Sequence, residues 1–130
     1  MKEVIATDKA PAAIGPYSQA IRVKNLLYTS GVIPVEPSTG EIVSGVEAQA
    51  EKAMKNLKAL LEAGGASIES VIKTTVFIKN MEDFQTINKV YAEIFKEPFP
   101  ARSCVEVARL PKDVLIEIEA IAEVQMNSDL

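Results

Sequence analysis

The fold is decided by residues 99–124, FPARSCVEVARLPKDVLIEIEAIAEV, because charged and apolar residues alternate along most of this stretch. Side chains two positions apart in a β-strand share a face, so the alternation predicts two strands. The loop 109–113 between them contains Pro111, which has no backbone donor and does not fit inside a central strand. We therefore expect two strands joined by a tight loop.

The alternation divides each strand between two faces. One face of the first strand carries Ser103, Val105 and Val107, and the other carries Arg102, Cys104 and Glu106. The second strand repeats the split, with Ile116, Ile118, Ala120, Ala122 and Val124 opposite Glu117, Glu119 and Glu123. One face is expected to pack against a core, and the other to carry the charged and reactive side chains. If the two strands pair as a hairpin, Arg102 and Glu117 lie near each other.

Two interpretations of an Arg102–Glu117 pair stay open at this point. A solvated ion pair on a sheet contributes roughly 0–1 kcal/mol and has no further role. Alternatively, the planar and permanently charged guanidinium binds the carboxylate of a ligand through two parallel hydrogen bonds. The composition does not decide between them.

The composition favours one soluble domain. A chain of 130 residues with 48% hydrophobic and 25% charged residues is large enough to bury its own core. No apolar run approaches the roughly 20 residues that cross a bilayer. The segment Met1–Ile5 lacks the basic and apolar parts of a secretory signal, and the single cysteine forms no internal disulfide. These observations predict a cytoplasmic protein.

The absence of histidine narrows the possible chemistry. The usual zinc sites, the Ser-His-Asp triad and a Cys-His pair are all excluded. Acid–base chemistry near pH 7 is left to carboxylates, tyrosine, lysine, cysteine or bound water. A net charge of −4 without a basic run also argues against nucleic acid as a partner.

The rest of the chain predicts four more strands and two helices. The strands are expected at residues 4–6, 17–23, 26–30 and 71–79. Lys24-Asn25 forms a hairpin turn, and the β-branched strand 71–79 is central. The first helix begins with a capping box, Ser44 with Glu47, and runs to Gly64-Gly65. The second helix follows Asn80 as N-cap, with Asp83 placed to help, and runs to about Lys96.

The resulting order, β-β-β-α-β-α-β-β, predicts an α+β fold. It is a six-stranded, mainly antiparallel or mixed sheet with two helices on one face. The other face stays uncovered, and we expect it to hold Cys104 and many aliphatic residues. Such an exposed patch needs burial, which oligomerisation would supply.

Four further residues have two interpretations each. Tyr17 is a half-buried strand aromatic or a phenol that closes over a small polar ligand. Gly31, after Ser30, is a turn glycine or lets a ligand approach the backbone closely. Asn88 is a solvated helix residue or contacts the edge of a pocket. Cys104 has no histidine to lower its pKa, so packing or oxidant sensitivity is favoured over a nucleophilic role.

Six separated motifs stand out along the chain. They are AIGPYSQA (13–20), TSGVIP (29–34), KTTVFIK (73–79), PARSCVEV (100–107), LPKD (110–113) and IEIE (116–119). Together they resemble the RidA family, also called the YjgF/UK114 family, of reactive intermediate deaminases. The resemblance spans nearly the whole chain as one domain, 1–130, and only the polar tail 125–130 looks individual.

This resemblance implies a chorismate-mutase-like fold of the YjgF type. It also implies a homotrimer whose sheets face inward and whose ligand clefts lie between neighbouring subunits. The implied substrates are 2-imino acids and their enamine tautomers, such as 2-iminopropanoate and 2-iminobutanoate, which pyridoxal-phosphate dehydratases release from serine or threonine. The implied reaction is hydrolysis to a 2-keto acid and ammonia, without a metal or organic cofactor.

The resemblance also assigns residues to this reaction. Arg102 would hold the substrate carboxylate, and Glu117 would activate water or pass a proton to the departing nitrogen. The pocket would be lined by backbone groups of Gly31 and Cys104 and by the side chains of Tyr17, Ser30 and Asn88. Two alternatives remain: a small-carboxylate binding or regulatory protein without turnover, and an endoribonuclease or translation inhibitor as described for some relatives. The acidic charge weakens the second.

Overall fold

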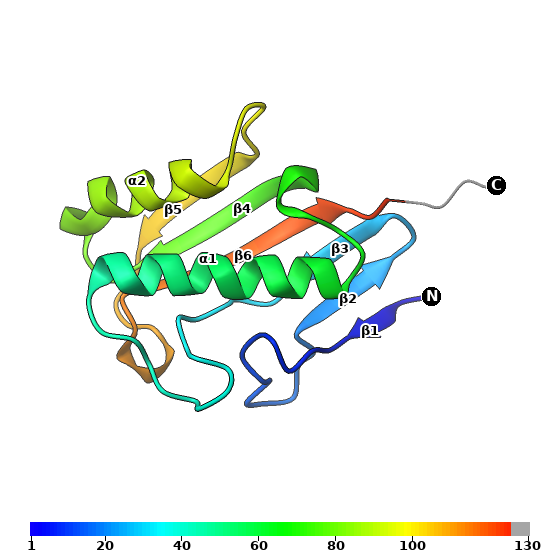
Figure 1. Ribbon diagram of the computed structural model, residues 1–130, viewed down its shortest axis with the longest axis horizontal. Coiled ribbons are helices and arrows are strands. Elements are labelled where there is room, and N and C mark those ends of the chain that lie inside the picture. Colours follow the sequence, from blue (N-terminus) through cyan, green and yellow to red (C-terminus); the bar gives the residue numbers. More distant parts are fainter. Residues whose placement is uncertain (126–130) are drawn as a thin grey trace.

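The chain folds into a β-sheet with two α-helices over one of its faces (Figure 1). The computed structural model describes residues 1–125, so the predicted tail lies outside the described residues except for Gln125. The strands are β1 (Glu3–Ile5), β2 (Ala20–Val23), β3 (Leu26–Thr29), β4 (Val71–Ile78), β5 (Ala101–Glu106) and β6 (Ile116–Glu123). The helices are α1 (Val46–Ala63) and α2 (Phe84–Ile94).

The strands lie in the order β1-β2-β3-β6-β4-β5. Neighbouring strands are antiparallel except for β4 and β5, which are parallel. The α+β fold with a six-stranded mixed sheet is therefore confirmed, as is the β2–β3 hairpin, where Lys24 has a φ of 55°. The predicted central strand is β4, between β6 and β5.

The last two strands do not pair as a hairpin, because β4 lies between β5 and β6. The chain passes from β4 through α2 to β5, and parallel neighbours need such a crossover. β5 therefore occupies the outer edge of β4. β6 returns to the other edge of β4, where its aliphatic face is buried in the core: Ile116, Ile118, Ala120 and Ala122.

The predicted faces of β5 also need correction. Arg102 is paired with Thr74, which is fully buried on the helix-covered side, and Cys104 points the same way. Cys104 packs against the main core and is not on the uncovered face. Glu117 is paired with Phe77, three residues from Thr74 along β4, and so lies on the opposite face. Within one chain, a strand and the thickness of the sheet separate Arg102 from Glu117.

The start of α1 differs from the prediction. Gly45 is the N-cap with a φ of 92°, and no side chain caps the helix, so the Ser44 capping box is wrong. The backbone turn at Gly45, which residues with a side chain rarely adopt, takes Ser44 out of line with the first turn. The buried Gln49 instead ties the helix start to its surroundings, donating to the Val43 carbonyl at 3.0 Å and accepting from the Leu115 N–H at 2.8 Å.

The second helix also starts later than predicted. A 3₁₀ turn, Met81–Asp83, precedes α2, and the Asn80 side chain caps neither. The Met81 N–H donates to Glu106 Oε1 at 2.7 Å, so an acid from β5 satisfies a backbone donor at this end. α2 ends at Ile94 rather than at Lys96.

The face turned away from the helices is uncovered in this chain and carries exposed apolar side chains, as expected apart from Cys104. These are Val4, Val23, Tyr28 and Val105. A smaller apolar cluster, separate from the main core, consists of Ile33, Val35, Leu110 and Val114. It supports the loops that form the pocket described next.

Candidate active site

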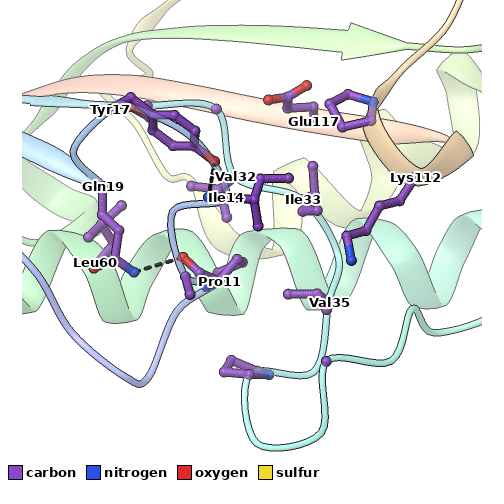
Figure 2. Close-up of a pocket in the computed structure, with 16 residues that line it drawn as sticks. Pro11, Ile14, Tyr17, Gln19, Val32, Ile33, Val35, Leu60, Lys112 and Glu117 are labelled. Carbon is purple, nitrogen blue, oxygen red and sulfur yellow. Dashed lines mark hydrogen bonds between the residues drawn. The ribbon is translucent and has the colours of Figure 1, made fainter.

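A pocket of about 190 Å³ lies beside Glu117 of β6, where the chain leaves β3 (Figure 2). Four of the predicted site residues line it: Tyr17, Ser30, Gly31 and Glu117. We call it the Glu117 pocket. Its other walls are mostly apolar, and Lys112 lies across the pocket from Tyr17.

Gly31 brings the backbone directly against the Glu117 carboxyl group. A Cβ atom at Gly31 would lie 2.6 Å from Glu117 Cδ, closer than real Cβ atoms come. The neighbouring backbone pair fixes this approach, because the Val32 N–H donates to Ile118 O at 2.7 Å and the Ile118 N–H donates to Val32 O at 3.1 Å. A side chain at position 31 would therefore force the Glu117 carboxyl group to move.

Tyr17 and Ser30 form the rim of the pocket from two adjoining segments. The Ser30 hydroxyl donates to the Ser18 carbonyl at 2.7 Å. The Tyr17 hydroxyl accepts from the Ile14 N–H at 3.2 Å, which folds the ring back over its own loop (Figure 2). The Tyr17 side chain is nevertheless exposed, so its phenol can also meet a ligand.

Two buried amides hold the walls of the pocket in place. Gln19 Nε2 donates to the Pro11 carbonyl at 2.7 Å and ties the N-terminal loop to β2 (Figure 2). Asn56 of α1 donates to the carbonyls of Ile33 and Val35 at 3.1 and 2.7 Å. These bonds satisfy backbone carbonyls of the loops that form the pocket walls.

The environment of Glu117 shifts its acidity. Burial raises the pKa of the Glu117 carboxyl above its usual value, and the nearby Glu119 raises it further. Across residues 1–125, no hydrogen bond or ion pair stabilises its ionised form. A carboxyl group shifted in this direction both accepts and returns protons closer to neutral pH than an ordinary glutamate does.

Arg102 lies in a second group, against α2. Its Nη1 donates to Asn88 Oδ1 at 2.7 Å. Its guanidinium carbon lies 4.7 Å from the centre of the Tyr91 ring and 5.6 Å from that of Phe84. No acid in the described chain pairs with it. We call Arg102, Asn88, Phe84 and Tyr91 the Arg102 cluster.

Cys104 lies beside this cluster on β5. Burial raises the pKa of its thiol, and the positive charge of Arg102 opposes that rise only in part. The thiol therefore stays protonated near neutral pH, which makes it a weak nucleophile. Its contact with the core favours packing over a catalytic role.

The structure thus brings the predicted residues together in two groups. The Glu117 pocket contains Tyr17, Ser30, Gly31 and Glu117, whereas Asn88 and Cys104 accompany Arg102 on the other face. The expected neighbourhood of Arg102 and Glu117 does not exist within one chain. It depended on the hairpin that the sheet order rules out.

Several residues of these groups were not predicted from the sequence, among them Gln19, Tyr91 and Lys112. Gln19 lies inside the motif AIGPYSQA, but nothing in a strand pattern reveals that its amide turns back to a loop. Tyr91 belongs to the apolar stripe of α2, where helical spacing alone indicates a core position. Lys112 is in a loop, where side-chain direction follows from its backbone φ of 56° rather than from any periodicity.

Two kinds of feature are absent from residues 1–125. No helix in that range is long and apolar enough to cross a membrane. The same range contains no group of three or more His, Cys, Asp or Glu side chains arranged to hold a metal ion.

The fold places this chain in a class of small α+β proteins with a six-stranded mixed sheet and two helices over one face. The crystal structure of the YjgF gene product of Escherichia coli superposes with a TM-score of 0.90 at 54% identity, covering 95% of this chain and 99% of that one. A family model described as Endoribonuclease L-PSP matches residues 7–124. The chain therefore belongs to this family, the RidA (YjgF/UK114) family that its motifs resemble.

One relative is named for imine chemistry, and the structure of another contains bound serine. The 2-iminobutanoate/2-iminopropanoate deaminase of E. coli K12 is 56% identical over 125 residues, which cover 94% of this chain and 98% of that protein. The structure of E. coli TdcF with bound serine has a TM-score of 0.90 at 51% identity and covers 95% of this chain and 99% of that one.

Proposed function

We propose that this protein hydrolyses the C=N bond of small 2-imino acids, including 2-iminopropanoate and 2-iminobutanoate, to 2-keto acids and ammonia. The observation that carries the proposal is the Glu117 carboxyl, half-buried, free of hydrogen-bond partners within residues 1–125, and held against Gly31 at the head of a pocket. The deaminase relative at 56% identity supports the same reaction.

Arg102 is the proposed anchor for the substrate carboxylate. A guanidinium has five N–H donors, and Asn88 takes one of them. The others are available for a planar, bidentate pair with a carboxylate. Because no acid within residues 1–125 competes for the guanidinium, a ligand meets an unpaired positive charge.

Glu117 is the proposed proton carrier. As the water oxygen bonds to C2 and the C=N double bond becomes single, Glu117 takes a proton from that water and passes it to the imine nitrogen. The product is a carbinolamine, and Glu117 is ionised again. The C–N bond then breaks while the proton of the new hydroxyl passes through Glu117 to the nitrogen. Ammonia leaves, and the 2-keto acid remains. The raised pKa of Glu117 suits a group that must be both base and acid in one cycle.

These two roles require a second copy of the chain. Arg102 and Glu117 lie on opposite faces, so one subunit cannot place both on one small substrate. We therefore include in the proposal a homotrimer in which Arg102 of one subunit faces the Glu117 pocket of its neighbour. The position of β5 at the sheet edge and the exposed apolar side chains of the uncovered face support this arrangement. A cytoplasmic location stays a prediction from the sequence.

A second candidate function is carboxylate binding without turnover. The relative with bound serine favours it, because serine also offers a carboxylate to an arginine. The two functions differ in what Glu117 must do. A binding protein needs Arg102 only, whereas hydrolysis needs both residues.

The test couples a threonine dehydratase to this protein and follows imine loss by semicarbazide trapping. We expect accelerated loss with the wild type, and a decrease of about 100-fold or more for Arg102→Ala, which removes charge-assisted bonds. Glu117→Gln should decrease the rate about 100-fold, the usual contribution of a general acid–base group. Arg109→Ala is the matched control, because Arg109 is exposed and forms its ion pair with Asp113, and neither residue belongs to the two groups. Wild-type rates in Arg102→Ala, or no acceleration by the wild type, would contradict the proposal.

A further inference from the structure

Tyr91 is a buried aromatic residue whose ring is fixed on two sides. Its side chain is 6% exposed, and its hydroxyl lies 2.8 Å from the hydroxyl of Thr74, which is 0% exposed. Its ring stacks on Phe95 with 4.4 Å between the ring centres and 29° between the planes. The hydrogen bond and the stacking together leave the ring little freedom to turn.

The fixed ring of Tyr91 is also the nearer of two aromatic rings against the Arg102 guanidinium. The guanidinium carbon lies 4.7 Å from the Tyr91 ring centre and 5.6 Å from that of Phe84. A cation over an aromatic face is attracted to it, and a guanidinium also stacks on such faces. Asn88 adds the hydrogen bond to Nη1. All three contacts come from α2.

The sheet register connects the two residues that Tyr91 contacts, Thr74 and Arg102. Thr74 and Arg102 are direct partners across β4 and β5. The residue that fixes the Tyr91 ring therefore sits beside the residue that the ring contacts. Burial raises the pKa of the Tyr91 hydroxyl, so the phenol stays neutral and offers Arg102 no competing anion.

We propose that Tyr91 is a positioning residue for Arg102: its ring, oriented by Thr74, sets the plane in which the guanidinium meets a carboxylate. The inference rests on the proposed function, because it takes Arg102 as the carboxylate anchor. It assigns Tyr91 a role beyond the core, where its helical spacing alone would place it. Tyr91 acts through Arg102 and does not touch the reacting atoms.

The first experiment compares KM and kcat of Tyr91→Leu and Tyr91→Phe in the imine assay. Tyr91→Leu removes the aromatic face, so we expect KM to rise about 10-fold with kcat changed less than about 3-fold. Tyr91→Phe keeps the face but loses the bond to Thr74 that orients it, so KM should rise by about 3-fold, less than in Tyr91→Leu. Ile87→Ala is the control for damage to α2, since Ile87 is buried on the same helix; it should lower thermal stability without moving KM.

The second experiment asks whether Tyr91 acts through Arg102. A lysine at position 102 keeps the charge but has no plane to orient. Tyr91→Leu should therefore change KM less than about 2-fold in an Arg102→Lys background. The inference is overturned if Tyr91→Leu changes KM by the same factor in the wild-type and Arg102→Lys backgrounds. It is also overturned if Tyr91→Leu alone leaves KM unchanged. Thr74→Val, expected to match Tyr91→Phe, keeps the question answerable if Tyr91→Leu does not fold.

A binding measurement separates this inference from the proposed function. Calorimetry with 2-oxobutanoate, a 2-keto acid with the same carboxylate, reports on Arg102 without turnover. Weaker binding by Tyr91→Leu and Arg102→Ala in a protein that hydrolyses no imine would overturn the proposed function and support the positioning role. If Arg102→Ala abolishes turnover but Tyr91→Leu does not affect it, the proposed function is supported and the positioning role of Tyr91 is overturned.

Discussion

The Glu117 pocket and the Arg102 cluster are held by different kinds of interaction. Glu117 is placed by the backbone, because β6 is paired on both sides and the Val32–Ile118 pair brings Gly31 against its carboxyl. Arg102 is on the edge strand β5, and its long side chain is directed by side chains of α2. A short carboxylate on a central strand needs no further support, whereas a flexible arginine at an edge does.

The electrostatics of the two groups differ in the same way. The sheet keeps Glu117 partly buried and beside Glu119, which favours the neutral carboxyl. Arg102 keeps its charge on an aromatic surface that does not neutralise it. One group is thus prepared to exchange protons and the other to attract an anion. The separation of the two is the feature most open to experiment.

The largest effect is expected when two inactive variants are mixed. If each site combines Arg102 of one subunit with Glu117 of another, Arg102→Ala and Glu117→Ala proteins should complement each other after joint unfolding and refolding. Random assembly of equal amounts leaves about a quarter of the sites with both residues, so activity should return to about a quarter of the wild-type rate. The imine assay measures it, with each variant refolded alone as control. No recovery in confirmed mixed oligomers would mean that both residues act from the same subunit.

A smaller effect is expected from a methyl group at Gly31. Gly31→Ala forces the Glu117 carboxyl to move, and a displacement of about 1 Å at a catalytic group costs up to about 100-fold in rate. We expect a loss of about 10-fold or more in kcat/KM. Gly15→Ala is the control, because its Cβ would lie 3.4 Å from the Tyr17 ring, within ordinary contact. Equal rates for both variants would show that the Gly31 approach does not position Glu117.

The raised pKa of Glu117 predicts how stability depends on pH. The folded state holds this proton more tightly than the unfolded state, so ionisation of Glu117 lowers stability as pH rises from the usual pKa of 4.5 through the raised value. Glu117→Gln removes the ionisable group. At pH values above this window, the substitution should raise the temperature of the thermal denaturation midpoint. Well below pH 4.5 it should leave that temperature unchanged.

The neighbouring acid provides the control for that measurement. Glu119→Gln removes only the second cause of the shift, so the change should have the same direction and be smaller. A midpoint for Glu117→Gln that falls at neutral pH would contradict the raised pKa.

The smallest effect is expected from Cys104. Its thiol pKa is raised by burial and its side chain packs against the core, so Cys104→Ala should change kcat/KM less than about 2-fold. It should cost about 1 kcal/mol of stability through the space it leaves. Rate and denaturation measurements on the same sample test both statements. A loss as large as that of Arg102→Ala would restore the nucleophile interpretation.

Much of the fold was predictable because its signals are local. The period-two alternation of residues 116–124 gives a strand with one buried face wherever that strand is placed. The β-branched residues 71–79 marked a central strand, and Gly64-Gly65 marked the end of α1. The helix starts were less predictable. Gln49 near the start of α1 accepts from the Leu115 N–H, 66 residues away, and the Met81 N–H donates to Glu106, 25 residues away, so neither contact could be predicted from local sequence.

The sequence by itself determined which side chains are available for chemistry: one cysteine, no histidine, and motifs that carry Arg102, Glu117, Tyr17 and Gly31. Only the tertiary structure decided which of these meet. Strand order depends on how the chain crosses from β4 to β5, a non-local choice that alternation does not encode. That crossover places β4 between Arg102 and Glu117. The strand registers then put the two side chains on opposite faces, because Arg102 pairs with Thr74 and Glu117 pairs with Phe77, an odd number of residues further along β4.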